Sequence, residues 1–280
     1  MDWQEISGNW VLIPQRPTAI VHFLGGAFVA TAPQVTYRWL LENLAQQGYA
    51  IIATPFVNTL DHAVMARQAL NTFEQALEYL QGTVFKKYLP IYGVGHSMGC
   101  KLHVLICAVF EQERAGNILI SFNNFPAKRS IPFLEQFSQA SSIVDTMRQS
   151  FPMVAEFTDQ FIKVSPARDV EFVPSPNETN QIIANEYNVS RNLLIKFRKD
   201  DIDQTQSLAD IMQQRFPELT TLRILNGNHL TPLGQDINWQ AGETFSPVDA
   251  IAQAVKQNVY QDLNDLKRNL LMWLNPLASV

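Results

Sequence analysis

The sequence predicts an α/β protein in which helices cover both faces of a mostly parallel sheet. Two observations lead to this fold class. Short apolar runs rich in β-branched residues, which are typical of strands buried on both faces, recur along the chain. Segments with the period of amphipathic helices separate these runs, and strands that alternate with helices form parallel sheets. The 280 residues suffice for one large domain of this kind.

The expected elements follow one another in a regular order. A helix opens near Thr31, carries Val35, Leu40, Leu41 and Leu44 on an inward stripe, and ends at Gly48. We expect further helices at 62–81, 98–112 and 248–274. The expected strands are residues 19–24, 49–56, 89–95, 117–122, 192–197 and 221–226.

Residues 126–190 interrupt this alternation. Prolines divide the segment into short pieces, and seven of the 17 phenylalanines lie between positions 125 and 172, which is too apolar for a solvated linker. The sequence SPNE at 175–178 has the form of a capping box and predicts a helix from Pro176 towards Tyr187. We therefore expect residues 1–125 and 191–280 to form the core and residues 126–190 to form a helical cap.

Composition excludes several classes of function. The net charge of −5 is mild and argues against a nucleic-acid partner. The first residues lack the features of a signal peptide, and no run of about 18 apolar residues occurs, so we expect a cytoplasmic protein without stable membrane insertion. No CxxC, paired-histidine helix or phosphate-loop lysine is present, and we expect no metal or cofactor.

The sequence GHSMG at residues 95–99 places Ser97 between an expected strand and an expected helix. At such a turn, a nucleophile elbow, the serine adopts a strained backbone and needs small neighbours, which Gly95 and Gly99 provide. The helix that starts at Met98 points free N–H groups at the place where an oxyanion would form. We expect Ser97 to be a nucleophile; the alternative is a serine in a structural turn.

A serine hydroxyl needs a base, and the order of residues selects His229. In chains with a nucleophile elbow, the acid and then the histidine follow the serine. Among the five histidines, His229 alone lies beyond Ser97 with room for an acid between them. We expect packing or turn roles for His96 and His103, which lie too close to Ser97. The alternative for His229 is a polar residue in a turn.

The acid should follow the strand at 192–197. Asp200, Asp201 and Asp203 all lie there. A carboxylate that accepts a hydrogen bond from the imidazole Nδ1–H fixes the tautomer and stabilises the imidazolium ion. Position along the chain leaves the three candidates open.

An oxyanion hole needs two backbone N–H groups, one from the residue after the nucleophile and one from the loop after an early strand. Met98 would supply the first. The sequence LGGAF at 24–28 has the right place for the second, and its glycines allow the backbone to approach a ligand closely. We expect the second donor to be the N–H of Gly26 or Ala27; a plain tight turn is the alternative.

The chain resembles α/β-hydrolases as a whole and, more narrowly, an uncharacterised family of cyanobacterial and plastid proteins. The segments that carry the narrower resemblance are residues 22–56, 93–105 and 226–232. LGGAF is similar to the His-Gly-Gly-Gly motif of esterases, with Leu24 in place of the histidine. In related sequences the triad acid is the fourth residue of a Gly-x-x-Asp turn. Arg198 takes the place of that glycine here, and the resemblance favours Asp201.

We therefore expect a serine hydrolase that cleaves a carboxylic ester through an acyl-enzyme, with Ser97, His229 and Asp201 as its triad. An acyltransferase with the same triad and a non-catalytic lipid or pigment carrier stay open. Six phenylalanines near the nucleophile favour a lipophilic acyl or prenyl group; alternatively they only hold the cap on the core. These six are Phe125, Phe133, Phe137, Phe151, Phe157 and Phe161.

Overall fold

The structure is a computed structural model that describes residues 1–27, 29–130, 171–234 and 247–275, with residues 247–259 described as helical backbone. Its centre is one sheet of eight strands in the order β1-β2-β4-β3-β5-β6-β7-β8. The strands are β1 (Gln4–Ile6), β2 (Asn9–Leu12), β3 (Ala19–Leu24), β4 (Tyr49–Ala53), β5 (Ile91–His96), β6 (Gly116–Ile120), β7 (Asn192–Phe197) and β8 (Thr220–Leu225).

The six strands from β3 to β8 are parallel, which confirms the predicted sheet. The hairpin of β1 and β2 adds an antiparallel edge beside β4. This hairpin is not among the expected strands. Its two-residue turn, Ser7 and Gly8, has positive φ at both positions (48° and 75°), as short hairpin turns require.

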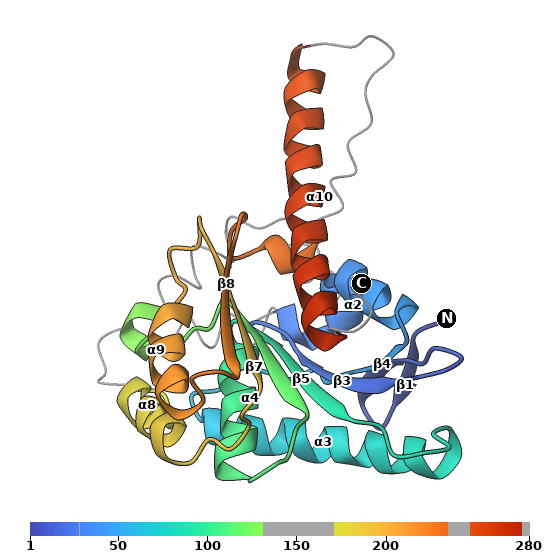
Figure 1. Cartoon of the computed structure of the whole chain (residues 1–280), viewed down its shortest axis with the longest axis vertical. Coiled ribbons are helices and arrows are strands. Elements are labelled where there is room, and N and C mark those ends of the chain that lie inside the picture. Colours follow the sequence, from blue (N-terminus) through green and yellow to red (C-terminus); the bar gives the residue numbers. More distant parts are fainter. Residues whose placement is uncertain (28, 131–170, 235–246, 276–280) are drawn as a thin grey trace.

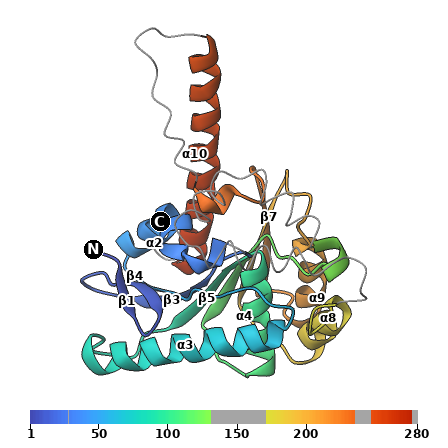
Figure 2. The same cartoon turned by 180° about the vertical axis from the view of Figure 1, so that it is seen from behind.

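Helices cover both faces of the sheet (Figures 1 and 2). On one face lie α3, α4, α8 and α9, and on the other lie α2 and α10. The helices are α1 (Pro33–Thr36), α2 (Arg38–Gln46), α3 (His62–Thr83), α4 (Met98–Val109), α8 (Pro176–Asn185), α9 (Thr205–Arg215) and α10 (Pro247–Leu274), with short 3-10 turns at η1 (Val29–Thr31) and η2 (Thr231–Leu233).

The buried side chains of the strands alternate between two cores, one under each layer of helices. In β3, Ile20 and Leu24 belong to the core beneath α3 and α4, whereas Val21 and Phe23 belong to the core beneath α2 and α10. This alternation follows from the two-residue period of a strand. It explains why the strand sequences are apolar throughout rather than at every second position.

Two expectations about helices need correction. The helix expected from Thr31 to Gly48 is broken at Tyr37 into α1 and α2, because Tyr37 leaves helical geometry (φ −114°, ψ 17°). As a result Val35, which we expected to face inward, is 58% exposed, while Leu40, Leu41 and Leu44 are buried as predicted.

Helix α4 also ends three residues early, at Val109 rather than at 112.

The capping box that the sequence predicts for α8 is present. Ser175 Oγ accepts a hydrogen bond from the Glu178 N–H, and the Glu178 carboxylate accepts one from the Ser175 N–H at 2.8 Å. Most of the expected cap, including Phe133, Phe137, Phe151, Phe157 and Phe161, lies outside the described residues, so the division into core and cap stays a prediction.

Candidate active site

Ser97 stands at a sharp turn between β5 and α4. Its backbone has φ 55° and ψ −116°, a combination that residues other than glycine rarely adopt. Both flanking glycines are required by contact: a Cβ on Gly95 would lie 2.8 Å from the Gly99 carbonyl carbon, and a Cβ on Gly99 would overlap the carbonyl oxygens of Leu24 and Gly25. The turn therefore has the geometry expected of a nucleophile elbow.

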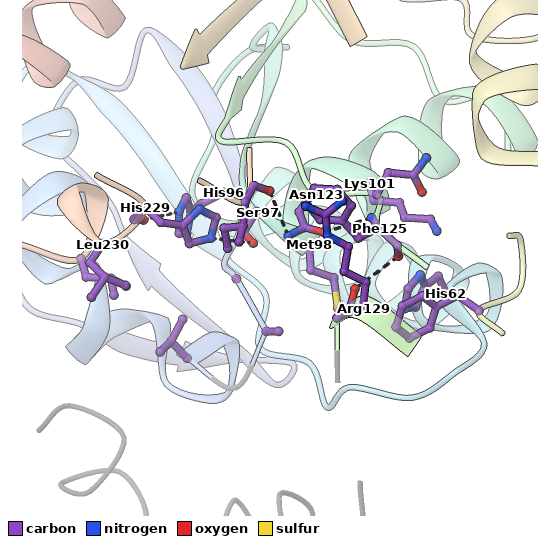
Figure 3. Close-up of a pocket in the computed structure, with 18 residues that line it drawn as sticks. His62, His96, Ser97, Met98, Lys101, Asn123, Phe125, Arg129, His229 and Leu230 are labelled. Atoms are coloured by element: carbon purple, nitrogen blue, oxygen red, sulfur yellow. Dashed lines mark hydrogen bonds between the residues drawn. The ribbon is translucent and has the colours of Figure 1, made fainter. Parts of the chain in front are cut away.

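Hydrogen bonds join Ser97 to His229 and His229 to Asp200. His229 Nε2 lies 3.0 Å from Ser97 Oγ, and His229 Nδ1 lies 2.9 Å from Asp200 Oδ2. Because a carboxylate accepts hydrogen bonds, Nδ1 carries the proton and Nε2 is left to accept from the serine hydroxyl. Figure 3 shows the His229 and His96 rings beside Ser97. The three segments meet because each follows the carboxyl end of a parallel strand: β5, β7 or β8.

The loop that carries His229 is held by its own polar residues. Gly227 adopts φ 115°, where a Cβ would overlap Thr231 Oγ1. Thr231 Oγ1 accepts a hydrogen bond from the Asn228 N–H, and Asn228 Oδ1 accepts one from the Leu230 N–H, both at 2.9 Å. The sequence NGNHLTP thus folds into a tight loop that fixes His229 over Ser97.

The partner of His229 is Asp200, not Asp201 as we expected. Asp201 is exposed, whereas the Asp200 side chain is fully buried. The third candidate, Asp203, is engaged elsewhere: it accepts hydrogen bonds from Lys196 Nζ at 2.5 Å and from the Thr205 N–H at 2.8 Å. Asp203 therefore helps to start α9 and does not reach the histidine.

The reason for this shift lies in the pairing of β7 and β8, which continues past the end of the strands. The Arg198 N–H donates to the Leu225 carbonyl, and the Lys199 N–H donates to the Gly227 carbonyl at 3.1 Å. Arg198 and Lys199 form the turn that ends β7, and Asp200 is the first residue after this turn. A glycine in place of Arg198 is not needed, since Arg198 does not adopt a positive φ.

Burial alone would raise the pKa of the Asp200 carboxyl. The hydrogen bond with His229, the positive charge that His229 can carry, and donation from the Ile202 N–H outweigh burial and keep this pKa below its ordinary value. Asp200 is therefore ionised at neutral pH. A buried carboxylate beside the imidazole favours the imidazolium ion that proton abstraction from serine would produce.

A second series of hydrogen bonds ends at the backbone carbonyl of His229. The Gly26 N–H donates to Tyr37 Oη at 2.7 Å, Tyr37 Oη lies 2.8 Å from His96 Nδ1, and His96 Nε2 lies 2.9 Å from the His229 carbonyl oxygen. Since a carbonyl only accepts, His96 Nε2 carries the proton, and Tyr37 donates to Nδ1. The hydrogen bonds of this series are all donated in one direction, from Gly26 towards His229.

His96 and Tyr37 hold this arrangement as neutral groups. Burial, together with the nearby His229, lowers the pKa of His96 to about 3. Burial raises the pKa of the Tyr37 hydroxyl well above its ordinary value. We expected only a packing or turn role for His96. A histidine beside the nucleophile was visible in the sequence, but its partner Tyr37, 59 residues away, was not.

The same series of hydrogen bonds revises the expected oxyanion hole. Because the Gly26 N–H already donates to Tyr37, it is not directed at a substrate oxygen. Gly26 keeps another role: a Cβ there would lie 3.2 Å from His96 Nδ1 and 3.3 Å from Ser97 Cβ. Ala27 and Met98 line the cavity beside Ser97 and remain the candidate donors.

A cavity of about 230 Å³ opens beside Ser97. Ser97 is 8% exposed, so the cavity is its route to solvent and to a ligand. Near one end lie Lys101 and His62, with Asn123 and Arg129 on the same side of Ser97 (Figure 3). Much of the wall is apolar, formed by Val29, Met98, Phe125, Phe172, Leu230 and Leu233.

Lys101 and His62 were not among the residues that the sequence analysis singled out. Lys101 was detectable in principle, because it is the one charged residue in the apolar helix MGCKLHVLICAV. His62 gives no such signal, since it opens a long amphipathic helix. Among the described residues, no three side chains of histidine, cysteine, aspartate or glutamate gather to hold a metal ion. No described helix is long and apolar enough to cross a bilayer.

A family of proteins of unknown function, DUF1350, matches residues 2–276. The chain belongs to this family. The match confirms the resemblance to an uncharacterised family on which part of the sequence analysis depended. The search of curated proteins found no significant match.

Solved structures show which fold this DUF1350 chain has. Carboxyl esterase 2 of Tuber melanosporum is 14% identical, with a TM-score of 0.53 over 91% of this chain and 82% of that one. The esterase Pf2001 of Pyrococcus furiosus is 14% identical, with 0.52 over 92% and 85%. The fluorophosphonate-binding serine hydrolase FphF of Staphylococcus aureus is 12% identical, with 0.52 over 91% of each chain. The chain has the α/β-hydrolase fold.

Proposed function

We propose that the protein is a serine hydrolase that cleaves a carboxylic ester. The observation that carries this proposal is the pair of hydrogen bonds from Ser97 through His229 to Asp200, at 3.0 and 2.9 Å. A polar turn without a catalytic role needs neither a strained serine nor a buried carboxylate behind a histidine. The similar folds of two esterases and a serine hydrolase agree with it.

The chemistry follows from the positions of these groups. Ser97 Oγ attacks the ester carbonyl while His229 Nε2 takes its proton, and Asp200 stabilises the resulting imidazolium ion. The N–H groups of Ala27 and Met98 stabilise the oxyanion. His229 then gives its proton to the departing alkoxide, which leaves as the alcohol. Water attacks the acyl-enzyme, returns a proton through His229 to Ser97, and releases the acid.

The apolar wall of the cavity supports an acyl chain as the bound part of the substrate. The side chains of Phe125, Phe172, Leu230 and Leu233 would bury methylene groups, each worth about 0.8 kcal/mol.

An acyltransferase would share the first half of this mechanism. It would give little free acid once a suitable alcohol or amine saturates the enzyme, whereas a hydrolase gives acid in water alone.

Labelling with a fluorophosphonate probe tests the proposal. We expect the label on Ser97 by mass spectrometry, and we expect Ser97→Ala and His229→Ala to abolish it, because an unactivated serine hydroxyl reacts poorly with the probe. Ser207→Ala, which changes an exposed serine on α9, is the matched control and should label normally. A folded wild-type protein that takes up no label, even with the shortest alkyl probe, would contradict the proposal.

A further inference from the structure

Lys101 is a buried amine close to the candidate nucleophile. It lies on the first turn of α4, four residues after Ser97, and is 1% exposed. Its Nζ donates one hydrogen bond, to the Pro174 carbonyl at 3.0 Å, and it forms no salt bridge with any described residue. An ammonium group has three donors, and a buried one is costly when they lack charged partners.

His62 lies close to Lys101, against the same phenylalanine ring, and its polar atoms are also unsatisfied among the described residues. It is 2% exposed, and within the described part of the chain neither ring nitrogen has a hydrogen-bond partner. Its ring stacks on Phe172 with centroids 4.3 Å apart, and Lys101 Nζ lies 5.7 Å from the centre of the same Phe172 ring. Both residues line the cavity that reaches Ser97, and Figure 3 shows them on the same side of Ser97.

The charge around this end of the cavity is positive. No aspartate or glutamate is among the described residues that line it, while Lys101 and Arg129 are, and Arg129 stacks over the Phe125 ring at 4.1 Å. The N-terminal end of α4 adds a partial positive charge. A neutral apolar substrate alone would leave these donors buried and unsatisfied.

Two acidic residues act on Lys101 from outside the cavity, and both have other partners. The Glu171 carboxylate accepts hydrogen bonds from the N–H groups of Ala127 and Phe172, both at 2.8 Å. Glu178 is occupied in the capping box of α8. Burial outweighs both carboxylates and lowers the pKa of Lys101 to about 7, and burial with the nearby Lys101 lowers that of His62. The site thus has room for a further negative charge.

We propose that the substrate carries an anionic group, a carboxylate or a phosphate-type group, that binds Lys101 Nζ and the His62 ring N–H while the ester carbonyl lies at Ser97. The substrate class is therefore an ester with an anionic end and an apolar chain between the two polar groups. The apolar wall holds the chain, and the unpartnered donors hold the charge. This inference rests on the proposed function for the position of the ester.

Binding to the Ser97→Ala protein tests the inference without turnover. The probes are monomethyl adipate, which has one carboxylate, and dimethyl adipate, which is neutral, each measured by calorimetry. We expect the anion to bind at least about tenfold more tightly, since hydrogen bonds to charged groups are stronger than those to neutral groups. Methyl 5-phosphonopentanoate, which has the same four methylene groups, is the third probe, and the tighter of the two anions identifies the group. Equal binding of the neutral diester and both anions would overturn the inference.

Substitutions at the two donors locate the binding. Lys101→Met keeps an unbranched side chain of nearly the same length and removes the amino group, and it should abolish the preference for the anion. His62→Phe keeps the stacking on Phe172 and should reduce the preference severalfold, which gives a second test if Lys101→Met does not fold. Lys128→Met, at an exposed lysine outside the cavity, is the matched control and should keep the preference. A preference that survives both Lys101→Met and His62→Phe would overturn the assignment.

Failure of the inference is separable from failure of the proposed function. If the probe labels Ser97 but anionic and neutral ligands bind alike, the hydrolase proposal stands and the anion site does not. If an anion binds through Lys101 but no label is found, the site binds an acidic ligand and the hydrolase proposal is wrong.

Discussion

The two sides of Ser97 differ in how their polar groups are satisfied. On the side of His229, the hydrogen bonds of Tyr37 and His96 run in a single direction, and Asp200 holds the far nitrogen of the imidazole. On the other side, Lys101 and His62 are as deeply buried, yet in the described part of the chain the hydrogen bond from Lys101 to the Pro174 carbonyl is the only one that either side chain makes. A network that is complete without a ligand fixes a reactive geometry in advance, whereas buried donors without partners mark where a ligand supplies what is missing.

The largest effect should come from changing Asp200, the carboxylate that accepts the hydrogen bond from His229. Asp200→Asn replaces the buried acceptor with an amide that no longer fixes the tautomer of His229, and we expect kcat to fall by about 10³ to 10⁴, as for the analogous change in serine proteases. Asp201→Asn, one residue away and exposed, should change kcat by less than about twofold. The measurement is hydrolysis of a p-nitrophenyl ester by each purified variant. The opposite order of effects would restore Asp201 as the triad acid.

A smaller effect should follow from breaking the middle of the same network. Tyr37→Phe leaves the Gly26 N–H and His96 Nδ1 buried without partners, and each such group costs about 1–3 kcal/mol. We expect the free energy of unfolding in urea to fall by at least about 1 kcal/mol. Tyr79→Phe, at a tyrosine that is 54% exposed, is the control and should leave stability unchanged. Equal stability of the two variants would mean that the Tyr37 hydroxyl contributes nothing to the network.

The effect that is smallest at neutral pH concerns the protonation of His96. Its pKa is about 3 in the folded protein and close to 6.5 when unfolded, so between these pH values the unfolded chain binds the extra proton. Its contribution to stability is fully present above pH 6.5 and is lost as the pH falls towards 3. His96→Asn should therefore reduce the slope of unfolding free energy against pH in this window by up to about 1.4 kcal/mol per unit.

Urea unfolding of wild type and His96→Asn between pH 4 and 7.5 measures this difference in slope. The buried His22, His62 and His103 also have lowered pKa values and keep a slope of the same sign in the variant. Identical slopes for the two proteins would show that His96 takes up its proton as easily in the fold as in the unfolded chain.

The sequence could predict the features that depend on order along the chain. Alternating apolar runs gave the parallel sheet, and the position of His229 after Ser97 correctly paired these two residues in space. The acid could not be chosen, because the choice depends on how far the β7–β8 ladder extends past Phe197. Tyr37, His62 and Lys101 were missed for a related reason. Sequence shows which groups are polar, but only packing shows which of them are buried and which have partners.

The position of β8 ties the candidate base to the edge of the sheet. Ser97 follows β5, which has a strand on either side, whereas His229 follows β8, whose outer edge pairs with no described strand and whose Arg223 and Ile224 are exposed. Strands with one neighbour and little burial open locally at a lower free energy than the interior. An opening of β8 would withdraw the base while the elbow around Ser97 stays folded. The reactivity of the serine would then fade in partly opened molecules, so that only an intact fold carries an activated nucleophile.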